Sequence, residues 1–215
     1  KFYWFVSTFH KKDEVSQGGA AIGVAVSDSP IGPFKDAIGK ALIINEMTTD
    51  MKYGWDDIDP TVFIDDDGQA YMFWGNGSCK WVKLNKNMIE VDGEITTFKP
   101  KNYIEGPWVY KRKGLYYLVY ASAGTKPEMI EYCTAKSITG PWKYQGIIQE
   151  NVQNSFTTHP GIIDYKGKSY FFYHNGSLPT GGSYRRSICV DYVHYNKDGT
   201  IQKIIQTNEG VGLVK

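Results

Sequence analysis

The sequence predicts an all-β protein, a β-propeller built from four-stranded antiparallel sheets. One hairpin pattern occurs three times, beginning at Asp59, Glu105 and His159. In each copy a titratable residue is followed by Gly or Pro, a short apolar run, a turn ending in Gly and an aromatic run. Aromatic residues make up 15% of the chain, 23 glycines are present, and no long helical pattern occurs. The copies recur at roughly 45–55 residues, the length of a propeller blade.

The first residues are predicted to form the second strand of a blade, not its first. Residues 1–8 form an aromatic run of the kind that ends each hairpin, and residues 20–27 form the next strand. The turn Asp28-Ser-Pro-Ile-Gly-Pro-Phe34 follows. Because the strand that would pair with residues 1–8 is not in the sequence, we expect it to precede residue 1. Residues 1–215 are therefore expected to be one propeller domain that is truncated at its N-terminus.

The remaining segments complete the four-strand pattern. The Gly-Pro-aromatic turn returns at residues 136–142, after a strand over 130–135. The other expected strands cover residues 80–84, 94–98, 187–195 and 201–207, with turns at 85–88 and 196–199. Three blades with their first strand, one without it and one upstream blade give five blades at most. A β-sandwich of hairpins is the alternative, since hairpin periodicity alone does not separate the two folds.

Charge and cysteine content exclude several classes of protein. The formal net charge is +1 and no basic stripe of the kind that nucleic acid requires is present. No apolar run is long enough to span a membrane. The three cysteines, Cys79, Cys133 and Cys189, are far apart, which argues against a disulfide framework and favours small buried strand residues. Asp65-Asp66-Asp67-Gly68 lacks the later ligands of an EF-hand and predicts a solvated hairpin turn.

The repeated titratable position predicts a catalytic centre. The first strand of each propeller blade lines the central channel, so Asp59, Glu105 and His159 are expected to converge at its mouth. Two carboxylates in an aromatic pocket suit cleavage of a glycosidic bond, because one of them must stay protonated to protonate the leaving oxygen. Burial and a neighbouring negative charge favour that protonated form. An inverting enzyme also needs a carboxylate base, with room for water between base and acid.

Residues around the acids are suited to sugar binding. Three tryptophans offer flat apolar faces: Trp55, Trp74 and Trp108. Three polar residues offer hydrogen bonds to hydroxyl groups: Asn76, Asn175 and Arg186. For Trp74 and Trp108, packing between blades is an equal alternative. Arg185 and Arg186 alternate along one strand, so only one of them faces the channel.

The motifs around these residues are similar to those of glycoside hydrolase family 43. The resemblance rests on Ile-Asp-Pro-Thr-Val-Phe-Ile-Asp-Asp-Asp-Gly around Asp59, Ile-Glu-Gly-Pro-Trp-Val-Tyr around Glu105 and Thr-Thr-His-Pro-Gly-Ile around His159. Ala-Ile-Gly-Val-Ala-Val-Ser-Asp-Ser-Pro-Ile-Gly-Pro-Phe resembles the second blade of that family. Tyr-Arg-Arg-Ser-Ile-Cys-Val-Asp-Tyr resembles the last blade of its arabinofuranosidase and xylosidase members. The motifs are in the family's order from residue 1 to about residue 210.

The resemblance implies a five-bladed propeller and an inverting hydrolase. Its substrates would be α-L-arabinofuranosyl or β-D-xylosyl linkages in arabinoxylan, arabinan or their oligosaccharides. Glu105 corresponds to the general acid, and Asp59 to the acidic residue that tunes and orients it. His159 corresponds to a histidine near the axis that helps to hold a hydrated calcium ion, although a histidine simply hydrogen-bonded in the channel is the alternative. Arg186, rather than Arg185, corresponds to the arginine that contacts the sugar.

One part of the family pattern has no counterpart in the chain. The family's general base is an Asp in the first blade, which would precede residue 1. Asp56 and Asp57 do not replace it, because they sit beside Asp59 and not on another blade. A non-catalytic carbohydrate-binding propeller is therefore the alternative function. A scaffold for protein partners is disfavoured, because it would not need paired carboxylates in one register.

Overall fold

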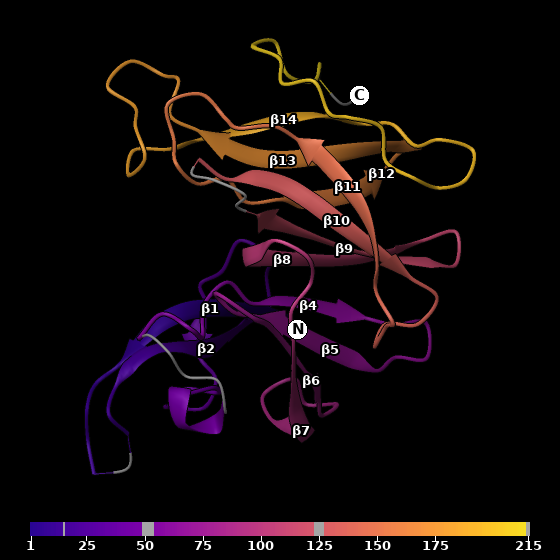
Figure 1. Ribbon diagram of the computed structural model, residues 1–215. Helices are drawn as coiled ribbons and strands as arrows, with labels where there is room; N and C mark the ends of the chain where they lie inside the picture. Colours follow the sequence, from indigo (N-terminus) through magenta and orange to yellow (C-terminus); the bar gives the residue numbers. More distant parts are fainter. Residues whose placement is uncertain (15, 49–53, 123–126, 214–215) are drawn as a thin grey trace. The chain divides into compact units, whose positions relative to one another are not determined.

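The computed structural model describes residues 1–14, 16–48, 54–122 and 127–213. The chain divides into two compact units, which are described separately. The first contains Lys1–Lys99 and Glu105–Pro107, and the second contains Pro100–Ile104 and Trp108–Lys215. Each unit has two antiparallel sheets whose strands follow one another in chain order (Figure 1).

The first unit begins with a three-stranded sheet and continues with a four-stranded sheet. β1 pairs with β2 without interruption from Phe2 opposite Ser27 to His10 opposite Gly19. The first sheet contains β1 (Phe2–His10), β2 (Gly19–Ser27) and β3 (Lys35–Asp36), and a short 3₁₀ helix (Asn45–Met47) follows it. The second sheet contains β4 (Thr61–Ile64), β5 (Ala70–Trp74), β6 (Cys79–Leu84) and β7 (Val91–Phe98).

The second unit repeats the pattern with four strands and then three. Its first sheet contains β8 (Tyr103–Arg112), β9 (Leu115–Ser122), β10 (Met129–Ala135) and β11 (Lys143–Gln149). Residues 105–107 of β8 belong to the first unit. The other sheet contains β12 (Gly161–Tyr165), β13 (Lys168–Asn175) and β14 (Ser187–Val193), which lie side by side in Figure 1.

The aromatic runs of the sequence form the most buried strands. Every residue of β5 is buried, and in β9 all residues after Leu115 are buried. Strands covered on both faces need continuous apolar runs and not an alternating pattern. The cysteines lie in β6, β10 and β14 and are unpaired, as expected; Cys79 and Cys133 are buried, whereas Cys189 is only partly covered.

In the second unit, tight turns join β8 to β9 and β12 to β13. The two-residue turns at Lys113-Gly114 and Lys166-Gly167 have positive φ at both positions, 49° and 77° in the first and 47° and 76° in the second. This is the type I′ geometry that matches the twist of the flanking strands. The predicted turn at residues 65–68 is confirmed: Gly68 N–H donates to the Asp65 carbonyl at 2.9 Å, with Gly68 at a φ of 83°.

The prediction of a strand over residues 201–207, all of which the structure describes, is wrong. The last sheet has three strands, and only Ile201 makes a bridge, to Tyr195. The segment packs instead against the preceding sheet of the second unit. Ile201 N–H donates to the Tyr132 hydroxyl at 2.9 Å, and Ile204 N–H donates to the Ile148 carbonyl at 2.7 Å. Both isoleucines are buried, so their apolar side chains pack in the core although the segment does not form a regular strand.

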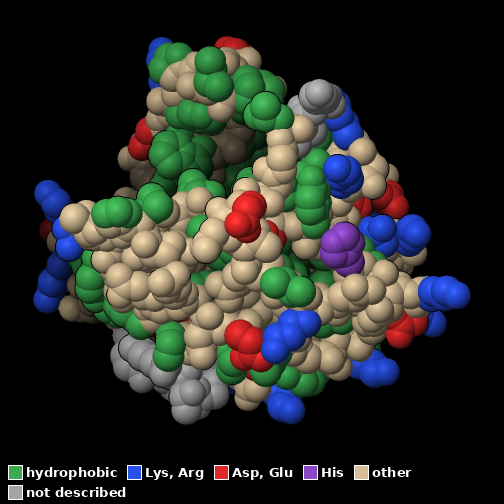
Figure 2. All heavy atoms as spheres, turned by 90° about the horizontal axis from the view of Figure 1, so that it is seen from above, with side chains coloured by type: hydrophobic (Ala, Val, Ile, Leu, Met, Phe, Trp, Pro, Cys, Tyr) green, Lys and Arg blue, Asp and Glu red, His purple; other side chains and the backbone are tan. Residues whose placement is uncertain are grey.

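Surface charge agrees with the composition. On the face shown in Figure 2, Lys and Arg side chains lie at several separate places with Asp and Glu among them. Among the described residues, no helix is long and apolar enough to cross a lipid bilayer.

Candidate active site

Asp59 occupies a strained position directly before β4. Its φ is 59°, in the left-handed region, although a residue before proline normally takes extended backbone. Asp tolerates this region better than most residues, but the conformation still costs about 1–3 kcal/mol. The neighbouring sheet helps to hold it, because Asp59 N–H donates to the Ser7 hydroxyl of β1 at 2.9 Å. Strain of this kind is typical of residues whose side-chain direction matters.

The segment of residues 56–58, directly before Asp59, is hydrogen-bonded to the residues that follow β5. Gly75 N–H donates to the Ile58 carbonyl at 2.9 Å, and Asn76 N–H donates to the Asp56 carbonyl at 3.1 Å. The Trp74 indole N–H donates to Asp57 Oδ1 at 2.7 Å. Asp56, Asp57 and Lys80 are all buried, and Lys80 Nζ lies 3.5 Å from the Asp56 carbonyl oxygen. Asp57 therefore has a structural role in this unit.

Glu105 lies inside a strand and not at its start. β8 begins two residues earlier, at Tyr103, and Gly106 follows Glu105 with a φ of 61°. That left-handed φ explains the Glu-Gly-Pro sequence, because glycine adopts it at little cost. The predicted register, in which the titratable residue precedes the inner strand, holds for Asp59 and His159 and is shifted for Glu105.

The first unit brings the two predicted carboxylates together. A carboxylate oxygen of Asp59 lies within 4.8 Å of one of Glu105. Asn76 Nδ2 donates to Glu105 Oε2 at 2.5 Å, so this side chain orients the carboxyl group. The sequence had suggested Asn76 as a partner for sugar hydroxyls, and the contact with Glu105 was not foreseen. Only its nearness to Trp74, directly after an aromatic strand, marked it as a residue at that end of the sheet.

In the second unit, His159 and Arg186 lie near His174 of β13. The ring centroids of His159 and His174 are 5.6 Å apart. Arg186 Nη1 lies 3.3 Å from His174 Nε2 and donates to the Thr157 hydroxyl at 3.1 Å. Thr157, which Arg186 contacts, lies two residues before His159 in the sequence; the choice of Arg186 over Arg185 stays a prediction. His174 was missed by sequence reasoning; no motif marked it.

The three tryptophans have different environments. Trp55 is 63% exposed and offers a face to solvent. Trp74 is fully buried at 0% exposure, so it presents no face to a sugar and the expected stacking role is replaced by its bond to Asp57. Trp108 is partly buried, packs against the core of the second unit and donates its indole N–H to the Ile162 carbonyl at 2.9 Å. The packing alternative therefore applies to Trp74, and Trp108 also packs against the core of its unit.

A calcium ion near His159 stays a prediction. Calcium prefers oxygen ligands, whereas the neighbouring His159 and His174 rings supply nitrogen atoms. These two rings do not form a direct calcium site. A hydrated ion held through water molecules, as the family resemblance implies, is the form compatible with His159.

Comparison with known proteins identifies the family. The profile of "Glycosyl hydrolases family 43" matches residues 1–201. The chain belongs to glycosyl hydrolase family 43. Among curated relatives of this family 43 chain, a β-D-galactofuranosidase from Aspergillus niger is 33% identical over 202 residues, covering 90% of this chain and 58% of the relative. An arabinoxylan arabinofuranohydrolase from Paenibacillus polymyxa is 28% identical, covering 97% of this chain and 38% of the relative.

Solved structures of family 43 agree with the fold. An α-L-arabinofuranosidase from Clostridium thermocellum superposes with a TM-score of 0.79 at 33% identity, over 95% of this chain and 69% of that one. A β-xylosidase/α-arabinofuranosidase from a compost metagenome, solved with xylotriose in a calcium-free form, gives 0.80 at 28% identity, over 94% and 69%. The predicted fold class, an all-β family 43 propeller with four sheets in this chain, is confirmed. The chain spans between 38% and 58% of the length of the two curated relatives above.

Proposed function

We propose that this chain is part of an inverting glycoside hydrolase that cleaves α-L-arabinofuranosyl or β-D-xylosyl linkages. The observation that carries the proposal is the pair of carboxylates, Asp59 and Glu105, within 4.8 Å in one unit, with Asn76 bonded to Glu105. Paired carboxylates with one fixed orientation suit proton donation to a glycosidic oxygen. Family membership supports the same chemistry.

Each residue has a separate role in the proposed reaction. Glu105 gives its proton to the leaving oxygen, and Asn76 holds the carboxyl group in position for that transfer. Asp59 places negative charge beside Glu105 and so favours retention of the proton until the bond breaks. Water attacks the anomeric carbon from the opposite side, and an Asp acting as general base, as in the family pattern, takes the proton of this water.

Substrate preference is proposed from relatives and from exposed groups. Structures of relatives have been solved with xylose, xylotriose and cellotetraose. Trp55 offers an exposed face for a sugar ring, and Arg186 supplies hydrogen bonds to hydroxyl groups. We therefore propose arabinoxylan, arabinan or their oligosaccharides as substrates. Assays with p-nitrophenyl α-L-arabinofuranoside and β-D-xyloside, run side by side, distinguish the two sugars.

The test of the acid uses Glu105→Gln in the full-length gene product. We expect kcat on a natural oligosaccharide to fall by about 10²–10⁴-fold, since general-acid catalysis contributes that much. Activity on 2,4-dinitrophenyl glycosides should fall far less, because that leaving group needs little protonation. The matched control is Glu94→Gln, at an exposed position of β7, which should retain full activity.

Three outcomes would contradict the proposal. Comparable turnover of Glu105→Gln on the natural substrate would remove Glu105 as the acid. Sugar binding without any turnover by the unmodified protein would favour the non-catalytic carbohydrate-binding propeller. A product with retained anomeric configuration, followed by NMR, would make Asp59 a nucleophile, because retaining enzymes hold their carboxyl groups only about 5–5.5 Å apart.

A further inference from the structure

A pocket lies in the second unit, at the turns of its hairpins. It is lined by residues of the β8–β9 turn, the β12–β13 turn and the segment that follows β14, and its volume is about 650 Å³. His159 precedes β12, whereas the turn at Lys166-Gly167 follows it. The five residues of β12 therefore separate this pocket from His159 by roughly 17 Å. It is not part of the candidate active site.

Cationic side chains from three separate segments line this pocket: Arg112, Lys113, Lys168 and Lys197. The three lysines are exposed, whereas Arg112 is partly buried. Arg112 is held by Asp164, with its Nε 3.3 Å from Asp164 Oδ2, so its charge is largely balanced within the protein. Asp164 also accepts a hydrogen bond from the Ser169 hydroxyl. The lysines therefore supply the net positive charge of the pocket.

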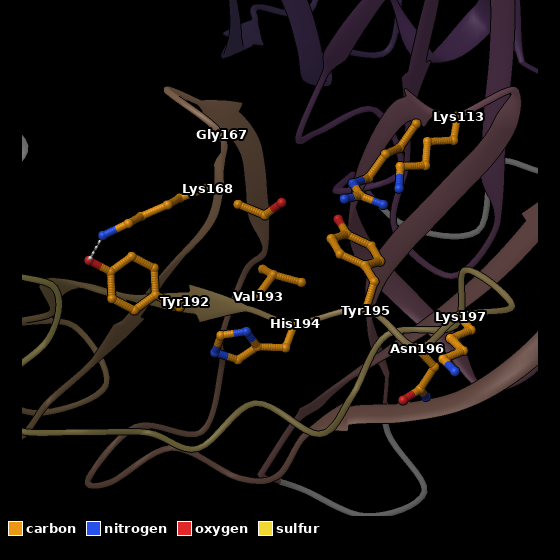
Figure 3. Close-up of a pocket in the computed structure, with 11 residues that line it drawn as sticks. Lys113, Gly167, Lys168, Tyr192, Val193, His194, Tyr195, Asn196 and Lys197 are labelled. Carbon is orange, nitrogen blue, oxygen red and sulfur yellow. Dashed lines mark hydrogen bonds between the residues drawn. The ribbon is translucent and has the colours of Figure 1, made fainter.

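Aromatic rings form two sides of the same pocket. Figure 3 shows Lys168 and Tyr192 on one side and Lys113 and Tyr195 on the other, with Val193 between them. Lys168 Nζ lies 3.4 Å from the Tyr192 hydroxyl. Tyr195 stacks under the Arg112 guanidinium, 3.9 Å from the ring centroid, and its hydroxyl is 2.9 Å from that of Tyr110. Burial raises the pKa of Tyr195, so at neutral pH this phenol stays uncharged and does not offset the lysines.

The size and the mixture of groups define the class of ligand. The volume is within the range of small-molecule sites and exceeds what a single inorganic anion fills. The Tyr195 ring is already covered by the Arg112 guanidinium, so Tyr192 is the tyrosine available to the apolar face of a sugar ring, and the ammonium groups bind a carboxylate as point charges. We propose that this pocket, here named the basic-aromatic pocket, binds a saccharide unit that carries a carboxylate, such as a hexuronate. The inference goes beyond the proposed hydrolysis and concerns a binding site separate from it.

The test is a binding titration with matched acidic and neutral probes. The unmodified protein is titrated, by calorimetry and by amide NMR, with a xylo-oligosaccharide carrying one glucuronate and with the same oligosaccharide lacking it. We expect the acidic probe to bind at least about 10-fold more tightly, because charge-assisted hydrogen bonds are the stronger kind. Its binding should also weaken as salt rises from about 0.02 to 0.5 M, because the lysines are exposed to screening. The shifted amides should include Gly167, Val193 and Asn196.

Two variants separate this pocket from general surface charge. Lys168→Met combined with Lys197→Met should weaken the acidic probe about 10-fold and leave the neutral probe unchanged. Lys166→Met is the control: Lys166 lies in the same turn as Gly167 but is not among the residues that line the pocket. Equal affinity for both probes, or equal losses in the control, would overturn the proposal. Tighter binding of inorganic phosphate than of glucuronate would show an anion site and would also overturn it. Because binding is measured without turnover, failure here leaves the hydrolase proposal untouched.

Discussion

The bond between Trp74 and Asp57 is expected to be one of the stronger side-chain contributions to the first unit. Both residues have 0% exposure, and the indole N–H to Oδ1 distance is 2.7 Å. Trp74→Phe removes the donor, and a hydrogen bond to a charged group contributes about 1.5–3 kcal/mol. The smaller ring leaves roughly 40 Å³ unfilled, which adds about 1 kcal/mol. We therefore expect the free energy of unfolding to fall by about 2.5–4 kcal/mol, or the melting temperature by about 5–15 °C.

Urea unfolding followed by circular dichroism measures this loss, with an unchanged m value as the sign that only stability has changed. Trp81→Phe is the control, since Trp81 lies in the adjacent strand of the same sheet and is only partly buried. A double-mutant cycle with Asp57→Asn isolates the pairwise contribution. A coupling energy below about 0.5 kcal/mol, or an equal loss in Trp81→Phe, would refute the importance of this bond.

Two further predictions concern pH and calcium. The Gln17 N–H and the Ser16 hydroxyl donate to the Glu46 carboxylate at 2.7 and 2.8 Å, and these bonds, the first above all, lower the pKa of Glu46 below 4.5. The stabilisation from these two bonds is thus complete above pH 4.5 and is lost as pH falls through the lower pKa of the folded state. Glu46→Gln should abolish this pH dependence. NMR titration measures the pKa of Glu46 in the folded protein, and a value of 4.5 or more would contradict the prediction. If a hydrated calcium ion is held near His159, millimolar CaCl₂ should raise the melting temperature relative to a sample in EGTA. The variant His159→Ala should not show this increase. An unchanged melting temperature in the unmodified protein would rule the ion out.

Local pattern was sufficient for most strands and turns. The aromatic runs and the Gly-containing turns each depend on residues close in sequence, so the hairpins and the turn at residues 65–68 were predictable. The failure at residues 201–207 has a physical reason. The apolar residues Ile201 and Ile204 are buried as a strand would require, but they pack against β10 and β11 instead of pairing along β14. An apolar pattern specifies burial and does not specify the partner.

The side-chain roles depended on contacts between distant residues. β5 is covered on both faces, so its sequence has no alternation that would show which way Trp74 points. Asn76 and Glu105 are 29 residues apart, and their bond follows from the packing of separate elements. The basic-aromatic pocket gathers groups from three segments and has no continuous motif.

By itself the sequence determined the all-β class, the repeating hairpins, the family resemblance and the proposal of Asp59 and Glu105 as a pair of neighbouring carboxylates. These properties are expressed in short motifs and in a period that the chain carries locally. Tertiary structure alone decided that Trp74 holds Asp57, that Asn76 orients Glu105 and that lysines of separate segments share one pocket. Such contacts form only when segments far apart along the chain pack together, because a side chain's partner depends on which elements meet.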